Sequence, residues 1–229
     1  MSVFHNFIQI EPTPEMQKIA VRHAKLRTEA IIRQFIPRHA PLSHIESNYI
    51  GALGEIVVRD YFGFPINLKD DYAANHVDSG DICIDGKMYD IKTEATPVRY
   101  YRKLFYGTIK PHEPYGCRVW TAKHEHHLEK YDGGVIFVAI PIPNDSKSDR
   151  KEGLLRPRII DFARQIIIIG YVERSRFNSM KPDWYSPPHP VTGKRRKYNS
   201  PNYIFHHSVI HPLWGLKNIN SSHGSTGSP

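Results

Sequence analysis

Cysteine is scarce in this chain of 229 residues, which contains only Cys83 and Cys117. Two cysteines are too few for the disulfide scaffold that stabilises many small secreted domains. The sequence also lacks an apolar run of about 18 residues, the length that spans a membrane. Its N-terminal stretch has neither the basic start nor the long apolar region of a signal peptide. We therefore expect a soluble, cytoplasmic protein with no membrane partner.

Acidic residues are outnumbered by basic ones. The chain has 31 Lys and Arg against 23 Asp and Glu, which gives a formal net charge of +8 and a pI of about 9.4. Such an excess is typical of a domain that binds a polyanion. The hydrophobic content of 40% is sufficient for one α/β core. We expect a single domain over residues 1–220, followed by a disordered tail over 221–229.

The stretch GDICIDGKMYDIKTE, residues 80–94, has the pattern of a β-hairpin. Asp85-Gly86 suits a two-residue turn, and the flanking segments alternate between apolar and other residues. This register places Asp81 opposite Asp90. Two carboxylates in that position repel each other at a Cβ separation of roughly 4.5–5.5 Å, unless a cation lies between them.

A divalent cation would resolve this repulsion. Carboxylate ligands without neighbouring imidazole or thiolate favour Mg²⁺, with Mn²⁺ as a substitute, over Zn²⁺. Lys92 shares the face of Asp81 and Asp90, where its ammonium group could hold a nucleophilic water or stabilise a developing oxyanion. The alternative is a solvated hairpin that carries these charges without a function.

A helix is expected upstream, over residues 47–64, with Ser47 as its N-cap. Its apolar residues form one stripe, and Glu55 lies at the edge of that stripe beside the small residues Gly51 and Gly54. A half-buried acid is costly without a partner. We therefore expect Glu55 to face a cation or the hairpin site, and the alternative is a surface glutamate.

Together these residues resemble the PD-(D/E)XK nuclease superfamily, through Glu55 on a helix, Asp81 on one strand and Asp90-Ile91-Lys92 on the next. The resemblance implies an α/β fold with a restriction-endonuclease-like core, in which helices flank a central mixed β-sheet. It also implies a metal-dependent DNA endonuclease. In such an enzyme, the metal ligands would be Asp81 and Asp90, with Glu55 as a direct or water-mediated ligand. Lys92 would assist the attacking water. Gly80 stands where the motif has proline.

Other segments fit such a core. The apolar runs 133–142 and 164–177 predict buried strands, and 120–131 predicts a helix before the first of them. The segment 202–216 predicts a short strand and a helical turn. A further helix is expected near residues 14–36, with Thr13 as N-cap and Pro37 as its stop.

Two basic segments could bind DNA. Residues 99–118 interleave basic and aromatic side chains in a region that looks irregular, and 181–203 reads as a long proline-rich loop with a basic cluster. Both segments could also be solvated basic loops. The DNA-binding candidates are Arg99, Arg102, Lys103, Arg118, Lys194, Arg195, Arg196 and Lys197.

Several functional alternatives stay open. A nucleic-acid-binding module could keep the same fold without cutting, and a nuclease of branched DNA or RNA could use the same residues. The preferred partner is duplex DNA, and a homodimer is a further option. A zinc site is a further alternative, because the 14 histidines include His124, His126, His127, His206, His207 and His211. The spacing of His126 and His127 on a helix and the lack of a cysteine pair make it unfavourable.

Overall fold

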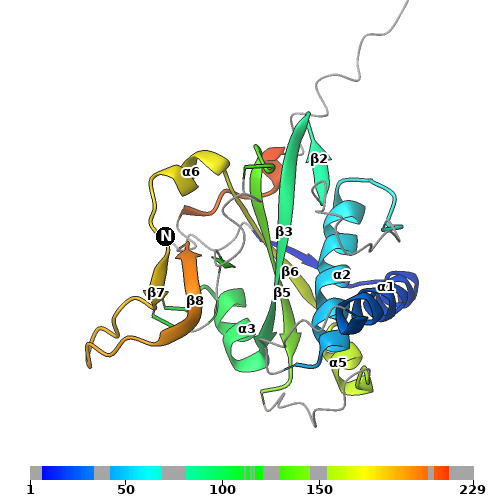
Figure 1. The fold of residues 1–229 in the computed structure, drawn as a ribbon, viewed down its shortest axis with the longest axis horizontal. Coiled ribbons are helices and arrows are strands. Elements are labelled where there is room, and N and C mark those ends of the chain that lie inside the picture. The colour runs from blue at the N-terminus through cyan, green and yellow to red at the C-terminus, as the bar shows by residue number, and fades with distance from the viewer. Residues whose placement is uncertain are drawn as a thin grey trace, which may run out of the picture.

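The computed structural model describes residues 7–33, 42–68, 81–110, 112–113, 115, 117–120, 129–144, 154–205 and 209–216. These residues form an α/β structure with two β-sheets and helices around the larger one (Figure 1). Within them, no helix is long and apolar enough to cross a membrane.

The larger sheet has the strand order β1-β6-β5-β3-β2. β3 and β5 are parallel, whereas the other neighbouring strands are antiparallel, so this is the mixed sheet that we expected. Every residue of β5 is buried, as its continuous apolar run predicted. The strands are β1 Ile8–Ile10, β2 Ile82–Ile84, β3 Lys87–Pro97, β5 Gly134–Ile142 and β6 Ile166–Val172.

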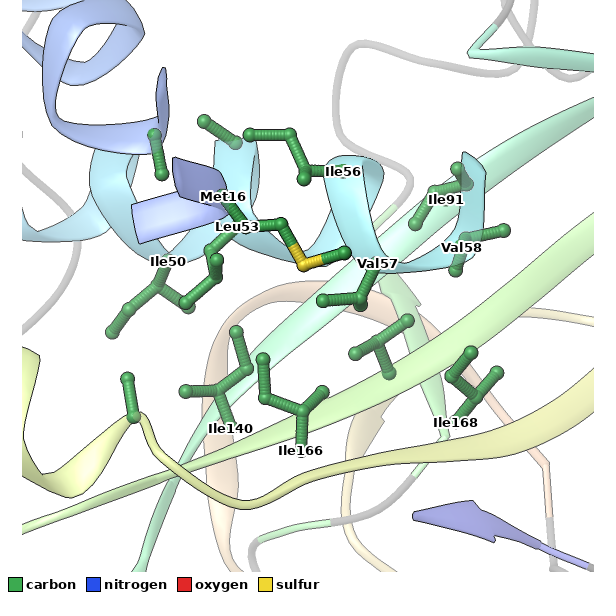
Figure 2. Packing of buried hydrophobic residues seen from close by; sticks show 14 of the residues in the cluster. Met16, Ile50, Leu53, Ile56, Val57, Val58, Ile91, Ile140, Ile166 and Ile168 are labelled. Atoms are coloured by element: carbon green, nitrogen blue, oxygen red, sulfur yellow. The ribbon is translucent and has the colours of Figure 1, made fainter. Parts of the chain in front are cut away.

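Three helices cover one face of this sheet and enclose the main core. Ile50, Leu53 and Val57 project from one helix towards the strand residues Ile140 and Ile166 (Figure 2). This spacing is the apolar stripe that buries one side of a helix. The helices are α1 Pro14–Arg33, α2 His44–Tyr61 and α5 Pro157–Phe162.

The opposite face is covered by two helices and the smaller sheet (Figure 1). Val135 and Phe137 of β5 pack on this side, whereas the alternating residues Ile136 and Val138 pack on the other side. Because side chains alternate along a strand, both faces of the central sheet are buried. The covering elements are α3 Val98–Phe105, α6 Arg174–Asn178, and a sheet of β4 Arg118–Trp120, β8 Lys197–Ile204 and β7 Asp183–Tyr185 in that order.

The predicted hairpin is confirmed. Asp85 and Gly86 both have positive φ, at 51° and 76°, and Cys83 pairs with Met88 in the expected register. The predicted start of α1 is also confirmed, because the N–H of Met16 donates to the hydroxyl of Thr13 at 3.2 Å.

The N-cap of α2 is Ser43 and not Ser47, so the helix begins one turn earlier than we predicted. Ser43 and Glu46 form a capping box, in which each side chain accepts a hydrogen bond from the backbone of the other. Ser-x-x-Glu at residues 43–46 is the local signature of a capping box, which the prediction of Ser47 overlooked. Glu46 also pairs with Arg156 from a distant part of the chain.

Both basic segments are more regular than we predicted. Residues 98–105 form α3, and the segment 181–203 contains β7 and most of β8 in place of a long loop. Of the predicted helix over 120–131, Trp120 lies in β4 and residues 121–128 lie outside the described residues. The predicted tail 221–229 and the predicted helix stop at Pro37 also lie outside them.

Candidate active site

The candidate site lies at the edge of β3 that β2 leaves unpaired. Pairing between β2 and β3 stops at Ile82 and Tyr89, whereas β3 continues to Pro97. In the part of the chain that the structure describes, no strand pairs with this edge of β3 beyond Tyr89. Groups from both faces of the sheet can therefore approach one another around the edge.

Asp81 lies just before β2, beyond the last regular pair of β2 with β3. Its N–H donates to the carbonyl of Tyr89 at 3.2 Å, and its own carbonyl accepts from Nη1 of Arg59 at 3.0 Å. The hairpin register predicted that Asp81 would pair directly with Asp90. This prediction is wrong, because the regular pairing ends at Ile82 and Tyr89 and Arg59 of α2 holds the carbonyl of Asp81. The Asp81 carboxylate instead accepts the N–H of Ile91 at 2.6 Å.

Asp90 and Lys92 form an ion pair on one face of β3. Nζ of Lys92 lies 3.0 Å from Oδ1 of Asp90 and 2.8 Å from Oδ2. The Asp90 side chain is only 5% exposed, whereas that of Lys92 is 40% exposed. Oδ2 of Asp90 is buried, and within the described residues its charge is compensated by the ammonium group of Lys92.

The carboxylates of the site repel one another. Burial, followed by the charges of Glu55 and Asp90, raises the pKa of Asp81 well above its ordinary value. The hydrogen bond from Ile91 and the charge of Lys92 lower this pKa without cancelling the rise. Glu55 pairs with Arg27 and Asp90 pairs with Lys92. Asp81 is therefore the acid whose ionised form is disfavoured, and a divalent cation would stabilise it.

Lys92 stays protonated at neutral pH. Burial opposes its charge, but the carboxylates of Asp90, Asp81 and Glu55 more than offset this effect and raise the pKa of Lys92. A lysine with a raised pKa is a poor general base. Its chemistry here would be electrostatic, through a fixed positive charge next to a developing anion.

Glu55 has a cationic partner that sequence reasoning missed. Both oxygens of Glu55 accept hydrogen bonds from the guanidinium group of Arg27, at 2.8 and 2.7 Å. The two side chains are only 15% and 21% exposed, respectively. Arg27 lies on α1, and nothing local in the sequence links it to a residue on α2. The expected cation next to Glu55 is therefore a guanidinium group.

Gly54 allows α2 to lie directly against β3. A Cβ at this position would come within 1.9 Å of Oγ1 of Thr93 and 2.8 Å of the Thr93 Cβ and Cγ2. Only glycine fits such an approach. Because Gly54 precedes Glu55 and Thr93 follows Lys92, this contact sets the distance between the helix acid and the strand motif.

A metal would be held here by two carboxylates. Within the described residues, no group of three or more His, Cys, Asp and Glu side chains is placed to hold a metal ion. Asp81 and Asp90 remain as two acids that repel each other, and one or two carboxylates are the usual protein ligands of Mg²⁺. Of the histidines of the zinc alternative, His211 forms a β-bridge with Tyr171, and His124, His126, His127, His206 and His207 lie outside the described residues.

Further along the same face of β3, Glu94 connects the two sheets. Its carboxylate pairs with Arg118 of β4. The guanidinium of Arg118 lies 5.8 Å from the ring centre of Tyr115 and 5.4 Å from that of Tyr198 on β8. Arg118 is only 20% exposed. We infer that Arg118 joins β3 to the smaller sheet, which leaves it less available to phosphates than predicted.

The basic residues of α3 lie on the same side of the main sheet. Arg99 and Arg102 are exposed, and Arg99 lies 4.8 Å from the ring centre of Tyr100. Lys103 pairs with Glu113 in the following loop. Two of the three predicted DNA contacts on α3 are therefore exposed cations, and the third is partly neutralised.

The second basic cluster lies at the turn of the β7–β8 hairpin, which we define as residues 183–198. Lys194, Arg196 and Lys197 are exposed and form no ion pair within the described residues. Arg195 differs because it pairs with Asp183. The hairpin contacts the loop after α3, where the rings of His112 and His189 lie 4.5 Å apart.

Comparisons with family models, with curated proteins and with solved structures found no match to this chain. The resemblance to PD-(D/E)XK nucleases therefore rests on the four motif residues and on their arrangement. The structure brings Asp81, Asp90 and Lys92 together at one edge, with Glu55 near enough to affect the pKa of both Asp81 and Lys92.

Proposed function

We propose that this protein is a metal-dependent DNA endonuclease with a restriction-endonuclease-like core, and that it hydrolyses phosphodiester bonds at the edge of β3. The observation that carries this proposal is the raised pKa of Asp81 beside the ion pair of the buried Asp90 with the partly exposed Lys92. Glu55 and Asp90 already have cationic partners, so a purely structural edge would gain little from a third acid beside them, because a carboxylate removed from water without a counter-charge destabilises a fold.

Asp81 and Asp90 would hold Mg²⁺ or Mn²⁺. A bound cation of this type supplies an activated water and neutralises charge on a phosphate. The N–H of Ile91 orients the Asp81 carboxylate, and Lys92 orients that of Asp90. Both ligands are thus positioned by the same strand, which limits their rotation.

Lys92 would supply a fixed positive charge during hydrolysis. Its raised pKa keeps Nζ protonated, and its partial exposure leaves the ammonium group accessible to a phosphate next to Asp90. Stabilisation of the additional negative charge that develops on the phosphate is the effect expected of such a group. Glu55, held by Arg27, would act through water or through its charge.

The surface around the site is suited to DNA. Exposed cations on α3 and on the β7–β8 hairpin lie on the side of the main sheet that Asp90 and Lys92 face (Figure 1). Cations at this position would neutralise phosphates on either side of the scissile bond. The residues proposed for this role are Arg99, Arg102, Lys194, Arg196 and Lys197.

A binding module without catalysis is the second candidate, and one observation favours it. Glu55 pairs with Arg27, and Asp90 pairs with Lys92, so two of the three acids already have cationic partners. In such a module the pairs would serve the fold, and the basic surface alone would bind nucleic acid.

Cleavage assays with matched substrates separate these functions. Purified protein would be incubated with plasmid, linear duplex, single-stranded and branched DNA, and with RNA, in Mg²⁺, Mn²⁺ or EDTA. We expect cleavage of at least one DNA in Mg²⁺ or Mn²⁺ and none in EDTA. Binding of these nucleic acids without cleavage in either metal would instead support the binding module.

A further inference from the structure

We propose that the β7–β8 hairpin binds unpaired nucleotides, with Trp184 stacking on a base and Lys194, Arg196 and Lys197 contacting the phosphates. This inference rests on the proposed function and deepens it, because it names the form of nucleic acid that the protein recognises.

The hairpin is held by its own hydrogen bonds. The N–H of Ser186 donates to the carbonyl of Arg196 at 2.8 Å, and the N–H of Arg196 donates to the Ser186 hydroxyl at 2.9 Å. Nearer the tip, His189 and Lys194 are joined by a 2.9 Å hydrogen bond, and Gly193 turns the chain with a φ of +65°. A ligand would therefore meet a surface that is already ordered, which reduces the entropy lost on binding.

Two large aromatic side chains are exposed on β7. Trp184 is 48% exposed and Tyr185 is 39% exposed. The guanidinium of Arg195 lies 5.3 Å from the ring centre of Tyr185. In contrast, no ring or cation covers Trp184 among the described residues. An indole left open in this way is a platform on which a second flat ring can stack.

The charges of the hairpin match a polyanion. Lys197 pairs with Tyr185 across the strands, which places it on the face opposite to Trp184, so a bound chain would contact both faces of the hairpin. Asp183 is occupied by Arg195, which leaves Lys194, Arg196 and Lys197 as three exposed cations within the hairpin. A sugar–phosphate chain presents its charges at regular spacing and its bases as flat rings, so it can satisfy both features. An acidic peptide would satisfy only the cations.

The open indole favours unpaired over paired bases. In a duplex, base faces stack on one another, and a protein reads base edges through hydrogen-bonding groups in the grooves. Trp184 offers a single N–H donor but a large apolar face. Stacking on single-stranded bases uses that face and tolerates any sequence.

The hairpin is also connected to the candidate active site. Tyr198 of β8 lies against Arg118, which pairs with Glu94 on β3. Glu94 is two residues beyond Lys92 on the same face of the strand. A strand held on the hairpin thus lies on the side of the sheet where Lys92 and Asp90 meet.

Equilibrium binding in EDTA tests this inference without any cleavage. Fluorescence anisotropy would compare a labelled oligothymidine with a blunt duplex of the same length. We expect Trp184→Ala to weaken oligothymidine binding about 5- to 150-fold, the range for loss of one base–aromatic stack. Binding of the duplex should change by less than about 2-fold, because its bases cannot reach the indole.

Two further variants serve as controls. Trp184→Phe keeps an aromatic face and should retain most of the affinity for oligothymidine. Trp214→Ala removes an indole that is equally exposed, at 50%, but lies outside the hairpin, and it should have no effect. Circular dichroism and thermal melting would check that each variant folds. Quenching of tryptophan fluorescence by oligothymidine should be reduced in Trp184→Phe.

Equal weakening of single-strand and duplex binding by Trp184→Ala, or no weakening at all, would overturn the inference. So would competition by polyglutamate as strong as that by oligothymidine at matched charge, which would indicate a site for acidic proteins. Because the assay contains no divalent metal, failure of cleavage would refute the nuclease proposal alone. Conversely, a nuclease without dependence on Trp184 for single-strand binding would refute this inference alone.

Discussion

Replacement of Lys92 by alanine should reduce both stability and cleavage, but by different amounts. The substitution leaves Asp90, only 5% exposed, without its cation. Loss of a partner in a fully buried pair costs about 3–5 kcal/mol, and exposed pairs contribute at most about 1 kcal/mol. Because Lys92 is itself 40% exposed, we expect a loss of about 1–2 kcal/mol.

For a chain of this length, such a loss lowers Tm by about 2–8 °C. Most of the protein then stays folded at 25 °C, since domains of this kind have about 5–15 kcal/mol of stability. The cleavage rate should nevertheless fall by about 10²–10³-fold, the effect of losing one electrostatic stabiliser. Metal affinity should change little. The assay is single-turnover cleavage at saturating Mg²⁺, with thermal melting of the same samples.

Two variants separate the catalytic role of Lys92 from its structural role. Lys92→Arg keeps a positive charge beside Asp90 and should melt near the wild-type temperature, but its larger planar group should leave the rate reduced. Lys87→Ala removes an exposed lysine from the same strand and should change neither quantity. If Lys92→Ala melts as expected and cuts at the wild-type rate, the lysine has no part in the reaction.

Three other variants have effects whose direction follows from the structure. Gly54→Ala should destabilise the protein by about 1–3 kcal/mol in chemical unfolding, because its Cβ overlaps Thr93; wild-type stability would contradict the packing. Asp81→Asn keeps an oxygen that can accept the N–H of Ile91. Because the fold raises the pKa of Asp81, the stability that Asp81 contributes is fully present below its ordinary pKa and is lost as the pH rises through its raised pKa. In EDTA this variant should melt higher than wild type at neutral pH, with the difference shrinking in acid; a lower melting temperature at neutral pH would refute this. The double variant Lys194→Ala, Lys197→Ala should reduce the salt dependence of single-strand binding by about 1.4 in log–log slope, and an unchanged slope would exclude both lysines as phosphate contacts.

The hairpin and the central strands could be predicted because their signals are local. Asp85-Gly86 determines the turn and its register, and the buried strand β5 appears as one continuous apolar run. The position of Asp81 could not be derived in the same way. Its carbonyl is held by Arg59, a residue on α2, and only the folded chain brings the two together.

Long-range pairs explain the other differences. Arg27 and Glu55 are 28 residues apart and lie on different helices, so no periodicity relates them. The β7–β8 hairpin was read as a loop because prolines dominate its sequence, and proline lacks the N–H that a strand interior requires. In the structure, Pro187, Pro188 and Pro190 lie in the connection between the strands, where that N–H is not needed. Pro201 lies within β8, in the stretch where the register with β7 shifts.

The most direct test of the central claim is single-turnover cleavage of DNA by wild-type protein and by Asp90→Asn, measured at matched DNA occupancy in Mg²⁺. Asparagine keeps the size of the side chain and removes one ligand charge. We expect metal-dependent cleavage by the wild type and no detectable cleavage by Asp90→Asn. The variant should bind DNA as tightly as the wild type or more tightly, because repulsion of the phosphates is reduced. Cleavage by a folded Asp90→Asn protein at the wild-type rate would contradict it.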